Sequence, residues 1–166
     1  RQTTFFKCSG DQTMSILKVD TINEKTSGNG VQIAGHVIQV VHQPFSTNMS
    51  TQSTSFVTTG HSLSITPKSS SSKILISAQG GSWYVSAGQS RITLYKNGSN
   101  LLNADGLCMN DAQPYVPHSF VYYDTPNTTS ATTYTAYIKI DNASNTTYYS
   151  YPGYGKMGMT ATEIAQ

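Results

Sequence analysis

Short segments in which apolar and polar residues alternate recur along the chain, and no window has the 3.6-residue period of an amphipathic helix. Alternation of this kind is typical of β-strands, because successive side chains point to opposite faces of a sheet. Residues 133–140 are the clearest case, with Tyr134, Ala136, Ile138 and Ile140 on one face. About eight to ten such strands at this spacing predict an all-β protein built as a jelly-roll β-sandwich.

Residues 35–45 predict the strand around which the other strands are arranged. β-branched residues crowd together there, Pro44 argues against a helix, and apolar side chains occur on both faces of the extended chain. Because a strand with two apolar faces is usually covered from both sides, we expect this strand to be central. The chain therefore divides into an extended N-terminal arm, residues 1–34, and a jelly-roll domain, residues 35–166.

The arm has too few apolar residues to bury a core of its own. Residues 16–22 alternate like a strand, but a single strand is not stable in water and has to join a sheet. That sheet belongs either to the same domain or to a neighbouring subunit, and in the second case the arm is an assembly strand. We expect its apolar residues to mediate oligomerisation: Ile16, Leu17, Val19, Ile22, Val31 and Ile33.

Glycine positions predict two local features of the sheets. Gly80 and Gly81 follow a core strand at residues 73–79 and predict a bulge or bend before the next strand segment. Asn97 and Gly98 lie between alternating segments and predict a hairpin with a type I′ turn, since both residues tolerate the positive φ angles that this turn requires.

Two other regions predict breaks between strands. Residues 55–59 and 63–66 alternate like two edge strands, and Pro67 stops the second. Residues 103–118 lack alternation and predict a long irregular connection across one end of the sandwich.

Charged residues make up only 11% of the chain, whereas Ser and Thr make up about a quarter. Ordinary globular domains have a charged fraction of about a quarter, so the composition favours an extracellular or virion β protein. The formal net charge is +2 and no Lys/Arg cluster is present, which argues against nucleic-acid binding. No apolar run is long enough to span a bilayer, so membrane insertion is not expected.

No motif for a phosphate loop, a nucleophile elbow or a zinc-binding helix is present, so we predict no enzymatic activity and no cofactor. Four histidines fit hydrogen-bonded positions at strand ends or, as the alternative, a metal site between subunits: His36, His42, His61 and His118. Three acidic loop residues fit turn capping or a calcium site: Asp105, Asp111 and Asp124. The first alternative is preferred in both cases, and no metal site is predicted. Cys8 and Cys108 are predicted to be free thiols rather than a bridge between arm and domain.

Aromatic residues are the best candidates for ligand binding. Rigid rings supply a large contact area at a low entropic cost, and they stack well on the faces of sugars. The candidate glycan contacts are Trp83, Tyr84, Tyr149, Tyr151 and Tyr154, with burial in the core or in a subunit interface as the alternative. Five Asn-x-Ser/Thr triplets offer N-glycosylation sites if the chain passes through a glycosylating export pathway: Asn48, Asn97, Asn127, Asn142 and Asn145.

The chain also resembles known proteins in the order of several segments. These are VDTI, GNGVQIAGHVIQVVHQPFST, STSFVTTGHSLSITPKSSSSKILI, SRITLYKNGS, SFVYYDTPNTTSATTYTAYIKI and TATEIAQ, and with them residues 19–166 resemble the repeated module of phage tail-fibre and other virion appendage proteins. The strand order also resembles the trimeric jelly roll of complement and tumour-necrosis-factor-like domains, where LYKNG lies at a central hairpin. These resemblances imply a non-enzymatic, self-associating extracellular module. Unlike an ordinary tail fibre, the chain has no coiled-coil heptads, collagen-like repeat or long shaft.

The expected function is therefore that of a structural protein that self-assembles into a homo-oligomeric fibre, either extracellular or on a virion, with host-surface carbohydrate as a candidate ligand. A closed homotrimer follows from the complement-like resemblance. The alternative is a helical extracellular filament, with or without glycosylation, in which each arm strand completes the sheet of the next subunit.

Overall fold

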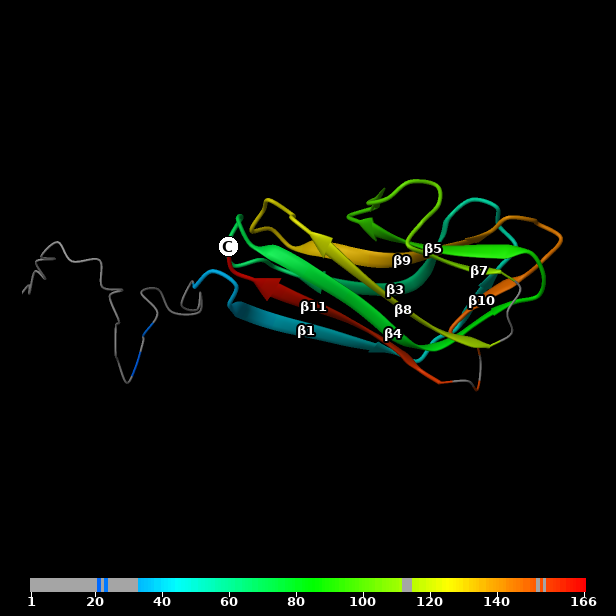
Figure 1. Ribbon diagram of the computed structural model, residues 1–166, viewed down its shortest axis with the longest axis horizontal. Helices are drawn as coiled ribbons and strands as arrows, with labels where there is room; N and C mark the ends of the chain where they lie inside the picture. The colour runs from blue at the N-terminus through cyan, green and yellow to red at the C-terminus, as the bar shows by residue number, and fades with distance from the viewer. Residues whose placement is uncertain (1–20, 22, 24–32, 112–114, 152, 154) are drawn as a thin grey trace, which may run out of the picture.

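The computed structural model describes residues 21, 23, 33–111, 115–151, 153 and 155–166. These residues form eleven strands and no helix, and the strands make two antiparallel sheets that pack against each other (Figure 1). The prediction of an all-β sandwich is therefore confirmed. Most of the predicted arm, residues 1–20, 22 and 24–32, lies outside the described residues.

The first sheet has the order β1-β11-β4-β10-β2, with β8 also paired to β4, and the second has the order β3-β9-β5-β6, with β7 also paired to β5. The strands are β1 (Val37–Phe45), β2 (Met49–Thr51), β3 (Val57–Ile65), β4 (Lys73–Val85), β5 (Gln89–Lys96), β6 (Ser99–Asn100), β7 (Cys108–Asp111), β8 (Val116–Asp124), β9 (Thr132–Ile140), β10 (Thr147–Tyr149) and β11 (Met157–Ile164).

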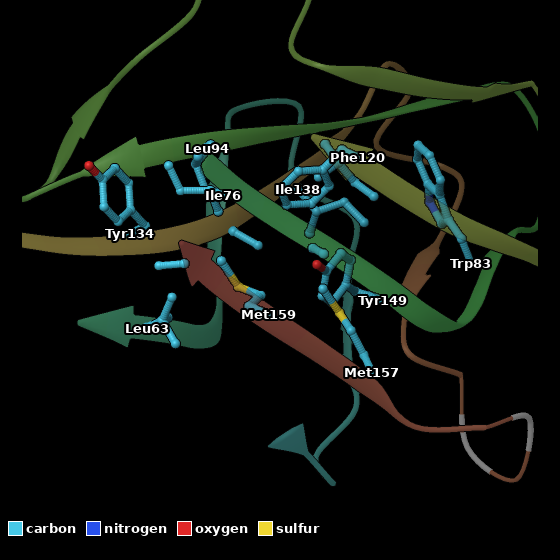
Figure 2. Close-up of a cluster of buried hydrophobic side chains, with 14 of the residues drawn as sticks. Leu63, Ile76, Trp83, Leu94, Phe120, Tyr134, Ile138, Tyr149, Met157 and Met159 are labelled. Carbon is cyan, nitrogen blue, oxygen red and sulfur yellow. The ribbon is translucent and has the colours of Figure 1, made fainter. Parts of the chain in front are cut away.

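The core lies between the two sheets and is filled by alternate side chains of each strand (Figure 2). In β9, every second residue from Thr132 to Ile140 is buried, as the alternation in the sequence predicts. Ile138 of β9 and Leu94 of β5 meet Ile76 of β4 and Met159 of β11 in one apolar cluster. Burial of such side chains is the main favourable term in the folding of a sandwich.

The prediction that residues 35–45 form the central strand is wrong. Among the described residues, β1 pairs only with β11, so it lies at an edge of the first sheet, and Val37 and Val40 are exposed. An edge suits Pro44, which has no N–H to give to a second neighbour. The central strand is β4, which pairs with β11 and β8 over its first half and with β10 near its end.

The predicted bulge and the predicted hairpin turn are both present. The pairing of β4 with β8 is irregular between Gly80 and Trp83, and Gly80 has a φ of 93°. A Cβ atom on Gly80 would lie 2.5 Å from the backbone oxygen of Lys156, so only glycine fits there. In the turn between β5 and β6, Asn97 and Gly98 have φ angles of 49° and 83°, as type I′ geometry requires.

Two predicted breaks differ from the structure. Residues 55–59 and 63–66 belong largely to one strand, β3, whose pairing shifts between Thr58 and Ser62. Gly60, with a φ of 77°, absorbs this irregularity without ending the strand. Residues 103–118 are not wholly irregular, because β7 lies within them and pairs with β5.

Candidate functional site

The outer face of β1, β11, β4 and β8 carries apolar side chains in register across all four strands. Val40 lies beside Thr162, which lies beside Leu75, which lies beside Tyr123. Directly opposed residues point to the same side of a sheet, so these side chains form a continuous row. The apolar face, as we name it, consists of Val37, Val40, Leu75, Val121, Tyr123 and Ile164.

Four members of the apolar face are strongly exposed. The exposed fractions are 62% for Val121, 59% for Val40, 47% for Tyr123 and 46% for Val37. These four make up most of the exposed large apolar side chains in the described part of the chain, where the others are Ile33, Met109 and Tyr115. Clustering of exposed apolar groups on one face is typical of surfaces that contact another molecule.

The apolar face carries little charge. Of the residues that share its rows, Lys73 alone has a charged side chain, and its Nζ lies 5.4 Å from the centre of the Tyr123 ring. Thr160, Thr162 and Ser77 supply hydroxyl groups between the apolar side chains. A face of this composition loses little electrostatic solvation when it is covered, because few charges have to be desolvated.

The exposed apolar groups lie in two patches at opposite edges of one sheet. Val37 and Val40 belong to β1, whereas Val121 and Tyr123 belong to β8. Within the described part of the chain, β1 pairs only with β11 and β8 only with β4, so both strands are sheet edges. Ile33, 53% exposed, precedes β1 and is the one predicted arm contact that the structure describes. The other five, Ile16, Leu17, Val19, Ile22 and Val31, lie outside the described residues.

A buried glutamate side chain attaches the edge strand β1 to its neighbours. Glu163 of β11 is fully buried and accepts hydrogen bonds from Gln39 Nε2 and from the backbone N–H of Lys68, the latter at 2.8 Å. Its partners lie in β1 and in the segment after β3, so the carboxylate ties an edge strand to the rest of the sandwich. Buried polar groups are tolerated where hydrogen bonds of this kind satisfy them.

Two of the predicted glycan contacts lie in the core instead. Trp83 is 2% exposed and Tyr149 is fully buried (Figure 2). The indole Nε1 of Trp83 donates to Thr147 Oγ1 at 3.1 Å, which satisfies its polar group inside the protein. Neither ring can stack on a sugar in this conformation, and the alternative of burial holds for both.

The other aromatic residues gather at the surface near the end of β4. Tyr84 lies at the centre of what we name the tyrosine cluster, with Tyr115, Tyr148 and Tyr151 around it at ring-centre distances of 5.1, 5.6 and 5.4 Å. Tyr84 and Tyr151 were predicted contacts, whereas Tyr154 lies outside the described residues. Tyr148 belongs to the tyrosine-rich segment at residues 148–154 of the sequence, but no sequence signal places Tyr115 beside it.

Two hollows adjoin the tyrosine cluster. The larger, about 290 Å³, is lined by Ser46, Asn48, Ser150, Tyr151, Gly153, Gly155 and Lys156. The smaller, about 100 Å³, is lined by Asn48, Met49, Ser50 and Tyr148. Asn48 belongs to both, and the rings of Tyr148 and Tyr151 contact each other at 4.9 Å. Aromatic rings therefore stand beside openings whose walls carry hydroxyl and amide groups.

Two of the four histidines are buried in a group of rings. His61 stacks on Phe45 at 4.3 Å, and Tyr149 lies between His61 and His118. Burial, and then the nearby His61, lower the pKa of His118 to about 4. Burial also lowers the pKa of His61, against the opposing effect of its hydrogen bond to the Thr47 carbonyl. Both rings are therefore neutral at neutral pH.

His61 forms the contact that most resembles a catalytic pair. Its Nε2 lies 3.1 Å from Thr47 Oγ1, but its Nδ1 finds no hydrogen-bond partner within the described structure. A catalytic triad needs an acidic group at that second nitrogen to orient the ring. His36 and His42 are exposed, and His42 Nδ1 contacts Thr160 Oγ1 at 2.9 Å.

The prediction that the three acidic residues lie in loops is wrong for two of them, because Asp111 ends β7 and Asp124 ends β8. Asp105 pairs with Arg91 at 3.1 Å, and Asp124 pairs with Lys96 at 3.0 Å, while Asp111 is exposed at the end of β7. In the part of the chain that the structure covers, no group of three or more His, Cys, Asp or Glu residues is placed to hold a metal ion. Nor does this part contain a helix with the length and apolar character that crossing a membrane requires.

The candidate modification sites are accessible to different degrees. Of the five sequon asparagines, Asn145 is half-buried. The other four are exposed: Asn48, Asn97, Asn127 and Asn142. Cys108 is a free thiol, and burial raises its pKa to about 11. A thiol with so high a pKa is a poor nucleophile at neutral pH. Cys8 lies outside the described residues.

Comparison of the chain with protein-family models finds no match, and a search of curated proteins finds none either. The resemblances to phage appendage modules and to complement-like domains gain no support from these comparisons and stay expectations. The apolar face and the tyrosine cluster are therefore the features from which a function can be inferred.

Proposed function

We propose that the protein is a non-enzymatic structural subunit that self-assembles into a homo-oligomeric fibre, extracellular or on a virion, with the apolar face as the contact between copies. The single observation that carries this proposal is the exposure of Val37, Val40, Val121 and Tyr123 on one sheet. Covering apolar surface contributes about 25 cal/mol per Å², so an uncovered face of this kind favours association.

A second copy of the same chain is the occupant that the two patches favour. One patch lies on β1 and the other on β8, at opposite edges of the same sheet. When the β8 patch of one copy covers the β1 patch of the next, each copy uses both patches, and the contact is heterologous. Three copies related in this way close into a homotrimer if the rotation permits, and otherwise they continue as a filament.

The jelly-roll topology is part of this proposal. The longer strands have the orders β1-β11-β4-β8 and β3-β9-β5-β7 in the two sheets, and the chain crosses repeatedly from one sheet to the other. Two four-stranded sheets joined by such crossings suit the eight-stranded jelly roll. The resemblance to complement-like domains then favours a closed trimer over other symmetries.

The filament alternative rests on the open edge of β1. Unpaired backbone groups along an edge strand accept an added strand readily. The predicted strand at residues 16–22 of a neighbouring copy would fill this edge, and the arm would then polymerise the protein head to tail. In this arrangement the arm, rather than the apolar face, holds the copies together.

Sedimentation velocity on three proteins tests the proposal. Wild type should sediment as an oligomer, and Val121→Glu should sediment as a monomer, because a buried, unpaired carboxylate opposes the contact. The matched control is Ser64→Glu, an exposed position of β3 on the second sheet, which should keep the oligomer. A wild-type protein that stays monomeric at high concentration, or a Val121→Glu protein that stays oligomeric, would contradict the proposal.

Removal of residues 1–34 separates the two arrangements. A closed trimer held by the apolar face should survive the deletion as a compact oligomer, whereas a filament that depends on arm exchange should dissociate. Negative-stain images of the full chain show directly whether the assembly is closed or continues as a fibre.

A further inference from the structure

The tyrosine cluster lies on the outer face of the first sheet, at the far end of β4 from the apolar face. Tyr148 is the register partner of Tyr84 on one side and of Ser50 on the other, so the three side chains stand in one row. In Figure 1, β10 lies toward one end of the molecule and β11 toward the other. The cluster and the apolar face share no residue, and each can be occupied while the other is free.

The backbone around the cluster has positive φ angles, which non-glycine residues rarely adopt. Four non-glycine residues in the described chain have positive φ angles, and two of these, Asn97 and Asn127, are asparagines, the residue type that tolerates this region best. The other two are Tyr115, a member of the cluster, and Ser150, which precedes Tyr151. Such outliers gather at binding sites, where the surrounding structure fixes a side chain for its ligand.

Other contacts hold the rings in place. The backbone N–H of Tyr151 donates to the Ser82 carbonyl at 2.8 Å, which attaches the loop after β10 to β4. Tyr115 stacks on Tyr84 and meets Tyr151 edge to face at 5.2 Å. Rings that are already ordered lose little conformational entropy when a ligand stacks on them.

The walls of the two hollows mix apolar and polar groups and are nearly uncharged. Asn48 supplies an amide to both, Ser46 and Ser150 supply hydroxyls to the larger, and Ser50 supplies one to the smaller. Lys156 is the one charged residue that lines them. At about 290 Å³, the larger hollow is at the lower end of the range for small-molecule sites.

We propose that the tyrosine cluster and its hollows form a carbohydrate-binding site. The apolar C–H face of a pyranose ring stacks on Tyr148 or Tyr151, and its hydroxyls exchange hydrogen bonds with Asn48 and the serines. Lys156 pairs with a carboxylate where the sugar is acidic. A nucleic acid would need several cations to neutralise its phosphates, and the walls offer one.

One of the predicted N-glycosylation sites lies inside this region. Asn48 is exposed and lines both hollows, and it begins the sequon Asn48-Met49-Ser50. A glycan attached to Asn48 would occupy the same space as a free sugar. Protein for the binding experiment should therefore come from a bacterial host that adds no N-linked glycans.

The test is an array of defined neutral and sialylated oligosaccharides, followed by calorimetric titration with N-acetyllactosamine, sialyllactose and the best array ligand. Wild type should bind at least one saccharide, and Tyr148→Ala should bind it about tenfold more weakly, the loss expected for an aromatic anchor. Tyr148→Phe, which keeps the ring, should retain most of the affinity. If the preferred sugar is acidic, Lys156→Gln should weaken that ligand and leave neutral sugars unaffected.

The matched control is Tyr137→Ala. Tyr137 also lies half-buried on an outer sheet face, stacked on Tyr95 at 3.7 Å, but on the second sheet and away from both hollows. It should bind sugars like wild type. The site is disproved if wild type binds no saccharide on the array or in solution, or if folded Tyr148→Ala and Tyr151→Ala proteins both keep the wild-type affinity.

This proposal and the proposed function fail separately. Val121→Glu should bind sugar with the wild-type affinity per subunit even where it has become monomeric, because Val121 is not part of the cluster. Loss of sugar binding in Val121→Glu, with full binding in Tyr148→Ala, would move the site to the apolar face and overturn the inference.

Discussion

The outer faces of the two sheets expose different kinds of side chain to solvent. On the second sheet, hydroxyl groups pair across strands, Ser62 with Thr135 at 2.8 Å and Ser64 with Thr133 at 2.7 Å. Tyr95 there stacks on a neighbouring tyrosine. On the first sheet, the outward positions of β1 and β8 expose apolar side chains instead.

Charge follows the same division. Arg91, on the outer side of β5, reaches Asp105 at 3.1 Å and Asp141 at 3.4 Å. These pairs are partly exposed and contribute little to stability, but they keep that face wettable. In the described part of the chain, the second face strongly exposes one large apolar side chain, Met109, whereas the first exposes four on β1 and β8. This difference between the two faces supports the proposal that a second copy covers the first sheet.

The largest effect on assembly is expected when opposite charges are introduced at the two edges of the apolar face. Val121→Glu and Val40→Lys should each dissociate the oligomer, at a cost of about 3 kcal/mol or more per contact, because each buries an unpaired charge. The double variant should reassociate, since a heterologous contact brings the glutamate of one copy to the lysine of the next. Sedimentation velocity at low and high salt measures both results.

The double variant also distinguishes the geometry of the contact. In an isologous dimer that places Val121 against Val121, the two glutamates would still repel each other and the double variant would stay monomeric. Such a result would retain the apolar face as an interface but exclude the cyclic arrangement of β8 against β1. The salt dependence provides a check, because an engineered ion pair weakens as salt is added.

Acid should lower the stability of the fold. This effect is smaller than that of the charge variants and does not distinguish the two faces. His61 of β3 and His118 of β8 face each other across Tyr149, one from each sheet. Because the folded state lowers both pKa values, the unfolded state binds more protons below about pH 6.5. Stability should therefore fall from that pH toward the His118 pKa of about 4, by roughly 3 kcal/mol for His118.

Urea unfolding of the monomeric Val121→Glu protein as a function of pH checks this expectation. In that background, His118→Phe should remove much of the acid loss, because phenylalanine fills the same space among the rings without titrating. An acid effect seen only in the assembled wild type would place the titrating group at the interface rather than in the core.

Much of the sandwich could be predicted from the sequence because its signals are local. Period-two alternation located most of the long strands, and the positive φ angles of Asn97 and Gly98 were implied by residue type. What alternation could not supply is which strand neighbours which. Residues 35–45 were expected at the centre because both of their faces are apolar, but an edge strand that binds a partner has the same pattern.

The candidate sites were harder to predict for the same reason. Trp83 and Tyr149 belong to the same aromatic class as Tyr84 and Tyr151, and only the direction of each side chain separates core from surface. The bulge at Gly80 shifts that direction part of the way along β4. The contact of Tyr115 with Tyr84 joins residues from different parts of the chain, and no local pattern encodes it.

The smallest effect is expected where the polar face is made apolar. The double variant Ser62→Ala/Thr135→Val removes both partners of one hydroxyl pair, and replacing both partners together is close to neutral, so stability should change by less than about 1 kcal/mol. The pair is only half-buried, so water can serve either hydroxyl in the single variants. Urea denaturation measures the change, and sedimentation should show the wild-type assembly.

A loss above about 2 kcal/mol would mean that the hydroxyl pairs hold the second sheet together. A new oligomer would mean that any apolar row on this sandwich is sufficient for association. In the second case, the exposed valines of the first sheet would no longer identify the side on which a partner binds.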